Sequence, residues 1–234
     1  MKKGDIKKQE ILTCAESLFC KQGYEQTSIQ DILDRLKASK GSFYHHFAGK
    51  ESLLEGICRV RAENACRNTV IRLDDSGDPI DSLNTVFSGM LPLSEEKTSF
   101  LLMILRIFNQ PEGRTVRQSF CDALSEQFLP LLSEKIDTAH RAGCLNCSEP
   151  ELTADLILFM LNRLWILIFG EIASAEEKGG EAGIPELLRI TDQYRIMIER
   201  TLMLPFGSVI LLDITSLRYV SEQIHNHWPV EPVS

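Results

Sequence analysis

Residues 27–54 constrain the fold more than any other stretch, because they specify two short helices with a tight break between them. Thr27 and Gln30 have the spacing of a capping box, in which two side chains satisfy the backbone amides at a helix start. We therefore expect the first short helix to begin at Thr27 or Ser28. Its buried face is predicted from apolar residues at helical spacing, which are Ile29, Ile32, Leu33 and Leu36.

The second short helix is predicted to follow a break at Lys37-Ala38 and to begin after Ser39, a residue type that caps helices. Phe43 and Phe47 lie four positions apart and should point inward together. The opposite side then carries cation, hydroxyl, phenol and imidazole groups, on Lys40, Ser42, Tyr44 and His45. Such groups suit phosphate oxygens and base edges.

A third helix is predicted to start at Gly49-Lys50-Glu51, where an ammonium group beside free backbone amides attracts an anion. Its apolar periodicity continues to about Arg72. One element should therefore connect the first quarter of the chain with the rest.

An ordered set of positions around this stretch carries a family resemblance. The set comprises Ala15, Leu18, Phe19, Gly23-Tyr24, Thr27-Ser28-Ile29, Ile32, Ser39 to Phe47 and Lys50 to Leu54. Through it, residues 6–54 resemble the DNA-binding domain of the TetR family of bacterial transcriptional regulators. The family usually has glycine at Lys37 and a larger hydrophobic residue at Ala38. The resemblance implies an all-α fold, with an N-terminal three-helix helix-turn-helix domain and a C-terminal helical domain for ligand binding and dimerisation.

The charge of the chain is unevenly distributed. The formal charge is −8, yet residues 1–54 hold nine basic and seven acidic residues, a net of +2, which leaves −10 on the other 180 residues. Lys2, Lys3, Lys7 and Lys8 begin the chain. They form either a basic arm that reaches a phosphate backbone or a solubilising terminus.

Composition predicts a soluble globular protein, since 44% of the residues are hydrophobic and 25% are charged. The most apolar stretch, residues 156–169, is interrupted by Asn162-Arg163 and is short for a membrane span, so we expect a cytoplasmic protein. Seven scattered cysteines suit a reducing compartment. Only Cys144 and Cys147 have motif spacing, and a thiol-based redox sensor using them is one alternative function.

The chain divides by prediction into a helix-turn-helix domain (1–54), a helical effector-binding and dimerisation domain (55–204) and a C-terminal extension packed on the latter (205–234). A long helix should kink or break at Pro130. Near residues 209–220 we expect a short extra helix against the dimer helices, or else a segment ordered only by the partner subunit. We expect further helices at 79–92, from Ser94 to Pro111-Glu112-Gly113, from about Thr115 to Ala142, at 151–173 and at 185–204.

The helix at 151–173 is apolar around more of its circumference than one face requires. We expect a two-fold homodimer in which the last two long helices meet their copies, as the resemblance also implies. The alternative is a buried central helix in a monomer. The predicted interface residues are Leu156, Phe159, Met160, Arg163, Leu164, Ile168, Ile190, Tyr194, Met197 and Ile198.

The resemblance also implies a small-molecule effector, bound among the helices of the second domain, that changes the spacing of the two recognition helices. The apolar character of the region indicates a largely hydrophobic effector, although each candidate is also expected as ordinary core. The acidic charge of the domain suits a cationic effector as an alternative, but surface acids explain that charge equally well. The candidate lining residues are Phe87, Met90, Phe100, Met103, Phe108, Phe120, Phe128 and Trp165.

The sequence shows no phosphate loop, nucleophile elbow or paired metal motif, so we expect neither an enzyme nor a cofactor or metal. The predicted function is a dimeric DNA-binding transcriptional regulator, a repressor released from a palindromic double-stranded operator by its effector. An alternative is a helical ligand- or protein-interaction module that no longer binds DNA. Phosphate contacts are predicted for Thr27, Ser28, Tyr44 and Lys50, and base-edge contacts for Gln30, Lys40, Gly41, Ser42 and His45.

Overall fold

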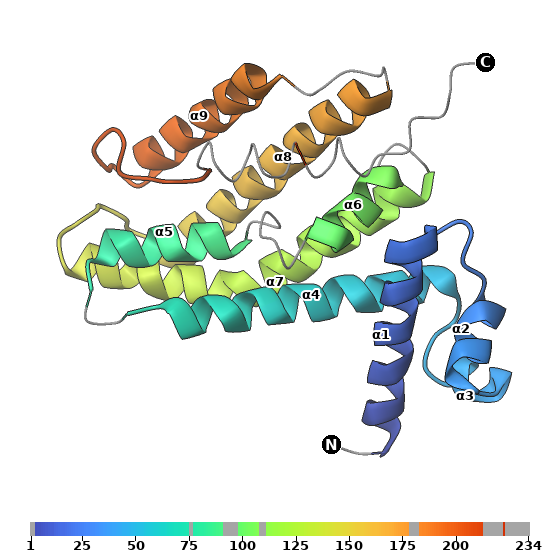
Figure 1. Ribbon diagram of the computed structural model, residues 1–234. Helices are drawn as coiled ribbons and strands as arrows, with labels where there is room; N and C mark the ends of the chain where they lie inside the picture. Colours follow the sequence, from blue (N-terminus) through green and yellow to red (C-terminus); the bar gives the residue numbers. More distant parts are fainter. Residues whose placement is uncertain are drawn as a thin grey trace.

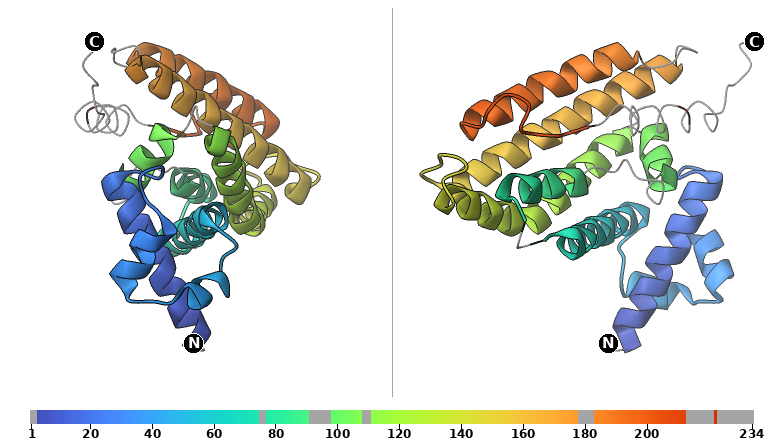
Figure 2. Two further views of the ribbon diagram at one scale, coloured as in Figure 1. Left: turned by 90° about the vertical axis from the view of Figure 1, so that its right-hand side faces the viewer. Right: turned by 60° about the vertical axis from the view of Figure 1, so that its left-hand side comes forward.

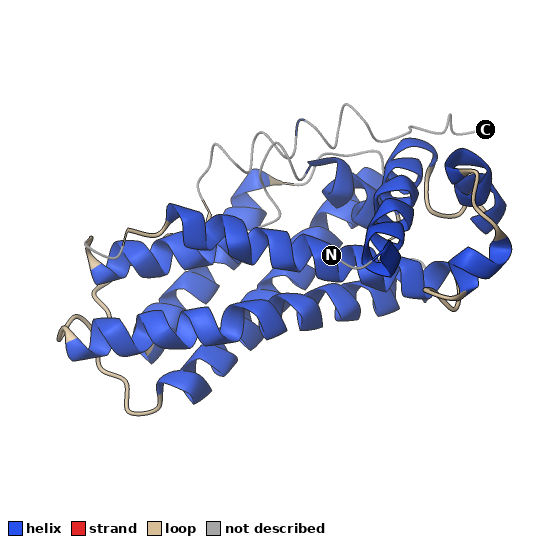
Figure 3. Ribbon diagram, turned by 90° about the horizontal axis from the view of Figure 1, so that it is seen from below, coloured by secondary structure: helices blue, strands red, loops and turns tan. Residues whose placement is uncertain are grey.

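The computed structural model describes residues 3–74, 77–90, 98–107, 111–177, 183–212 and 222, and the regular elements in these ranges are all helices (Figures 1 and 3). The elements are α1 (Lys3–Gln22), α2 (Ile29–Leu36), α3 (Lys40–Tyr44), α4 (Lys50–Arg72), α5 (Pro79–Met90), α6 (Thr98–Arg106), α7 (Pro111–Arg141), α8 (Pro150–Glu177) and α9 (Ile184–Thr201). The prediction of an all-α fold is confirmed.

The helices form a small group at one end and a larger bundle beside it. Helices α1, α2 and α3 gather around the start of α4, which then runs away from them along α7 (Figures 1 and 2). Helix α8 packs against α7 on one side and α9 on the other. Because α4 belongs to both groups, it ties the orientation of the small domain to the bundle.

Helix α6 packs into two hydrophobic cores at once. Its residues Leu101, Leu102 and Leu105 belong to the core of the bundle. Phe100, Met103 and Ile104 instead join the core of the small domain, which is built mainly from α1 to α4. The physical domain boundary therefore does not coincide with residue 54, because α6, far away in sequence, completes the small domain's core.

Helix α7 differs from its prediction at both the start and the middle. It begins at Pro111 and not near Thr115, so Pro111 to Gly113 form its first turn and do not end the preceding helix. Proline fits there because the first amides of a helix have no partner within the helix. The helix also continues through Pro130 without a break. Gly143 ends this region with a φ of 74°, as predicted for a glycine terminator. The predicted cap at Ser94 lies outside the described residues.

Helix α8 has the length and composition of a membrane span, because residues Pro150–Ala175 have a mean hydropathy of 1.9. Half of that stretch is buried inside the subunit. The core helix of a soluble protein meets the same criteria, so this feature is weak support for membrane insertion.

Residues 205–212 form a segment that we call the C-terminal strap, and it is not helical, contrary to the prediction for residues 209–212. The buried carboxylate of Glu199 accepts hydrogen bonds from the amides of Gly207 (2.9 Å) and Val209 (3.1 Å). The side chain of Asn84 on α5 donates to the carbonyl of Ser208 and accepts from the amide of Ile210. With its backbone groups bonded in this way, the strap inserts Val209 and Leu211 into the core of the bundle.

Candidate nucleic-acid interface

Helix α3 is short, and its position is fixed from behind. The hydroxyl of Ser39 accepts a hydrogen bond from the amide of Ser42 at 3.2 Å, which confirms the predicted cap. Phe43 and Phe47 are 0% and 4% exposed, and their ring centroids lie 5.9 Å apart. These two aromatic side chains anchor a helix that is too short to be stable alone.

The other side of α3 faces solvent. Lys40, Gly41, Tyr44 and His45 are exposed, and Ser42 is half-buried. Apart from its chain neighbours and the backbone of its own helix, no atom of the subunit lies within 4 Å of where a side chain at Gly41 would begin, so packing within the subunit does not require glycine there. A glycine in an open position on a short helix suits close approach by another surface.

Helix α2 begins with a capping box one residue later than predicted. Ser28 is the cap, its hydroxyl accepts from the amide of Asp31 at 3.1 Å, and the Asp31 carboxylate accepts from the Ser28 amide at 2.7 Å. Hydrogen bonds from the Ser28 backbone and hydroxyl lower the pKa of Asp31. Gln30 is exposed on the same helix and donates to Asp34 at 2.7 Å.

The predicted role of Thr27 has to be corrected. Thr27 is 0% exposed, and its hydroxyl donates to the carbonyl of Gly23 at 2.7 Å. A buried hydroxyl with an internal acceptor does not reach a phosphate, so Thr27 instead holds the turn between α1 and α2. The pairing of Thr27 with Gln30 as a capping box was wrong for the same reason.

Lys50 is also engaged within the domain. Its ammonium group donates to the carbonyl of Tyr24 at 2.7 Å and of Glu25 at 3.4 Å, and lies 4.2 Å from the centre of the Tyr24 ring. It therefore fixes the start of α4 to the turn between α1 and α2. Lys37, at a φ of 50°, forms the left-handed cap of α2, which explains why glycine would also suit that position.

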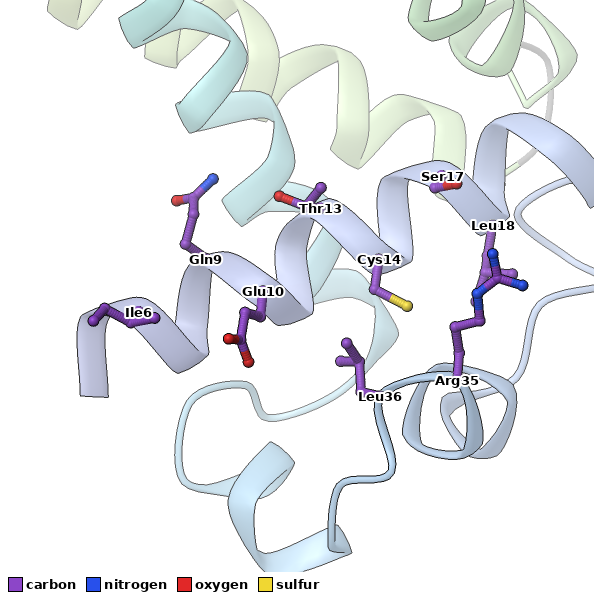
Figure 4. A pocket seen from close by; sticks show the side chains of 9 residues that line it. All are labelled: Ile6, Gln9, Glu10, Thr13, Cys14, Ser17, Leu18, Arg35 and Leu36. Carbon is purple, nitrogen blue, oxygen red and sulfur yellow. The ribbon is translucent and has the colours of Figure 1, made fainter. Parts of the chain in front are cut away.

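A separate groove of about 540 Å³ lies between α1 and α2, and Figure 4 shows its lining. It is lined by Ile6, Gln9, Glu10, Thr13, Cys14, Ser17, Leu18, Arg35 and Leu36. None of the predicted base-contacting residues is among them. The groove is therefore distinct from the exposed face of α3.

Comparison with known proteins agrees with this arrangement. Residues 11–57 match the family model described as bacterial regulatory proteins, tetR family. The HTH-type transcriptional repressor KstR2 of Mycobacterium tuberculosis is 23% identical over 164 residues, which cover 68% of this chain and 78% of the repressor. Residues 11–57 therefore have the sequence of a TetR-type DNA-binding domain. The regulator YerO of Bacillus subtilis is 30% identical over 118 residues, which cover 49% of this chain and 40% of YerO.

The TetR-type fold extends over the rest of the chain. A TetR-family transcriptional regulator from Pectobacterium atrosepticum superimposes with a TM-score of 0.55 at 18% identity, covering 86% of this chain and 97% of that regulator. At this identity, the likeness concerns the fold: an N-terminal helix-turn-helix domain followed by a helical domain.

The helical domain contains a small cavity between α6, α7 and α8. Its volume is about 20 Å³, and its lining presents only apolar atoms. Its lining residues are Ile104, Arg117, Phe120, Cys121, Leu124, Trp165, Ile166 and Phe169. Of the predicted effector residues, Phe120 and Trp165 line it. The positions at 117, 121 and 124 follow helical spacing, but only the tertiary structure shows which face of α7 they share.

The remaining predicted effector residues lie elsewhere. Phe87, Met90 and Phe128 are fully buried in the core of the bundle. Phe100 contacts Phe120 with ring centroids 5.6 Å apart, while Met103 belongs to the small domain's core. Phe108 lies outside the described residues. Burial of the first three leaves them with an ordinary packing role.

The predicted dimer residues fall into two groups. Leu164, Ile168 and Ile198 are 0% exposed, so their side chains fill the subunit core and are not available to a partner. The others are exposed or half-buried, namely Leu156, Phe159, Met160, Arg163, Ile190, Tyr194 and Met197. Leu152, which the sequence analysis missed, is 69% exposed and continues the same face of α8.

Cys144 and Cys147 occupy different environments at the corner between α7 and α8. Cys144 is exposed, whereas Cys147 is 6% exposed and its thiol donates to the hydroxyl of Thr153 at 3.1 Å. The amide of Cys147 donates to His140 Nδ1 at 3.3 Å. These are contacts of a structural residue, and they give no support to a thiol sensor.

Proposed function

We propose that this chain is a dimeric TetR-family repressor that binds a palindromic DNA operator and releases it when a small molecule binds in the helical domain. One observation carries the proposal: the exposed polar face of α3 is held rigid by the buried pair Phe43 and Phe47. A supported, solvent-facing recognition helix is what reading of the major groove requires.

Individual side chains are assigned by their exposure. Lys40, Gly41, Ser42 and His45 face base edges, with Lys40 directed to guanine O6 and N7, and Gln30 of α2 joins this group. Ser28 and Tyr44 contact phosphates and set the register. Lys50 contributes mainly by positioning, because its ammonium group already binds two carbonyl oxygens.

A dimer is supported by the apolar face of α8. Leu152, Leu156 and Phe159 lie on one stripe of that helix and are 69%, 49% and 69% exposed. A row of large apolar side chains open to water favours association with a matching surface. Two-fold symmetry then places two α3 helices on half-sites about one turn of DNA apart, roughly 34–36 Å, or more. Such a regulator works in the cytoplasm.

A chain of contacts supports a coupling between the two domains. Phe120 lines the cavity and packs on Phe100 of α6. The guanidinium of Arg61 on α4 lies 5.2 Å from the centre of the Phe100 ring and is bonded to Glu16 of α1 at 2.5 Å. A ligand that moves Phe120 therefore also disturbs the contact between α4 and α1. A coupling of about 1–3 kcal/mol would suffice for induction.

The decisive experiment is a gel-shift titration with the promoter region beside the gene's own coding sequence. We expect the wild-type chain to bind, and Lys40→Ala to lose its preference at one base pair, by about 1–3 kcal/mol. Lys21→Ala, on the exposed surface of α1, is the matched control and should bind normally. Absence of binding by the wild-type chain would favour the interaction module that no longer binds DNA.

A further inference from the structure

The first turns of α1 lie beside the end of the recognition helix. A side chain starting at Gly4 would begin 4.0 Å from Cε1 of His46, and the ammonium group of Lys8 lies 6.0 Å from the centre of the Phe47 ring. Gly4 and Lys8 are four positions apart, so they lie on one face of α1. Figure 1 shows these turns and α3 at the same end of the small domain. The face of α1 that carries Lys8 is therefore next to the segment that presents α3.

Close packing fixes this position of α1. Leu12, one turn after Lys8 on the same face, is buried. A side chain at Gly56 of α4 would begin 2.9 Å from Leu12 and 3.2 Å from Phe47, so both side chains pack closely on the backbone of α4. The backbone at Lys8 is therefore held in place relative to α3.

The charge of Lys8 is available to a partner. Lys8 is exposed, and its ammonium group pairs with no carboxylate among the described residues. Lys7, by contrast, is paired with Glu10 at 3.0 Å, and Lys50 donates to two carbonyl oxygens. Asp5, the other acid in the first turns of α1, has an interaction of its own. Lys8 therefore places a positive charge beside the recognition helix that the described part of the subunit does not neutralise.

We propose that α1 extends the DNA-binding surface, with the Lys8 ammonium group bound to a backbone phosphate beside the bases that α3 reads. A phosphate is the favoured target because Lys8 belongs to a neighbouring helix, and a flexible ammonium group binds phosphate as a point charge. This contact takes the place of the one predicted for Lys50, whose ammonium group is already bonded within the domain. The inference rests on the proposed function and adds a contact to the same interface.

The test measures DNA affinity by fluorescence anisotropy at salt concentrations from about 50 to 200 mM. One duplex carries the promoter region beside the gene's own coding sequence, and the other has a scrambled sequence. Lys8→Ala should reduce the slope of log affinity against log salt by about one for each bound subunit, on both duplexes, because one phosphate contact is lost. An unchanged slope, or a loss confined to the promoter duplex, would overturn the proposal.

Two further variants separate charge from structure. Lys8→Arg keeps the positive charge and should keep the wild-type slope. Lys21→Ala, in the last turn of the same helix, is the matched control and should also bind as wild type. A circular dichroism melt confirms that each variant is folded. A slope reduced equally in Lys8→Arg and Lys8→Ala would contradict a simple phosphate contact.

Lysine acetylation followed by mass spectrometry locates the contact directly. Bound DNA should slow acetylation of Lys8 several-fold and leave that of Lys21 unchanged, and equal acetylation of Lys8 with and without DNA would refute the contact. If the wild-type chain binds neither duplex, the proposed function itself fails. If it binds and Lys8→Ala keeps the wild-type slope, only the contact from α1 fails.

Discussion

Replacing Glu199 by alanine should destabilise the helical domain strongly, because this carboxylate holds the C-terminal strap in place. Glu199 is 3% exposed and binds Arg195 through both oxygens, at 2.9 and 2.8 Å. It also accepts the amides of Gly207 and Val209. In Glu199→Ala, the guanidinium of Arg195 remains in a site where only 15% of its side chain is exposed.

The expected cost follows from these contacts. Removal of one member of a buried ion pair costs about 3–5 kcal/mol, and a buried amide left without an acceptor, here that of Val209, adds about 1–3 kcal/mol, whereas Gly207 is exposed. Arg195 keeps Asp192 and the face of Phe206, and a released strap lets its amides reach water. We therefore expect the lower part of this range, about 3–4 kcal/mol. For a chain of 234 residues, this lowers Tm by about 10 °C.

Urea unfolding followed by circular dichroism, at one fixed protein concentration, measures this effect. The matched control is Asp192→Ala, since Asp192 bonds the same arginine but is 51% exposed, and its loss should cost under about 1 kcal/mol. Glu199→Ala combined with Arg195→Met should recover part of the stability, because the unpaired charge is removed. A loss below about 1 kcal/mol in Glu199→Ala would show that the strap is not held by this carboxylate.

Three further predictions concern the interface, the coupling and the recognition domain. Phe159→Asp should convert the proposed dimer to a 26.5 kDa monomer in light scattering, and a dimer of unchanged stability would move the interface away from α8. Arg61→Met should leave operator binding within a few-fold of wild type but reduce the response to effector, because Arg61 links Phe100 to Glu16. If effector still releases the operator fully in gel shifts, coupling does not pass through Arg61. Asp31→Asn should lower Tm at pH 7. The folded pKa of Asp31 lies below its ordinary value of 3.8, so the Tm difference between wild type and variant should shrink as the pH falls below about 4. A Tm difference that stays constant with pH would exclude the charged cap.

Much of the small domain was predictable because its sequence signals are local. The cap at Ser39, the buried pair Phe43 and Phe47, and the start of α4 at Lys50 all depend on residues within about one turn of each other. The start of α2 was not decided locally. The sequence offers two capping pairs one residue apart, and the burial of Thr27 against Gly23 selects Ser28 with Asp31.

The features that connect the domains could not be predicted, since they join residues distant in the chain. Arg61 pairs with Glu16 across α4 and α1, and Phe100 contacts Phe120 across α6 and α7, and each pair is brought together by tertiary packing. Apolar spacing shows that a residue is buried, but it does not show which core receives it. The same limit explains why Leu164 and Ile168 were assigned to a partner although they fill their own subunit.

The sequence by itself determined a helical chain, its helix-turn-helix and the polar residues of the recognition helix, because hydrogen-bonded caps and helical periodicity act over a few residues. Tertiary structure alone decided that α6 belongs to both cores, that Arg117 shares a cavity with Trp165, and that Glu199 binds the C-terminal strap. Those outcomes depend on which surfaces bury each other, and no short stretch of sequence carries that information.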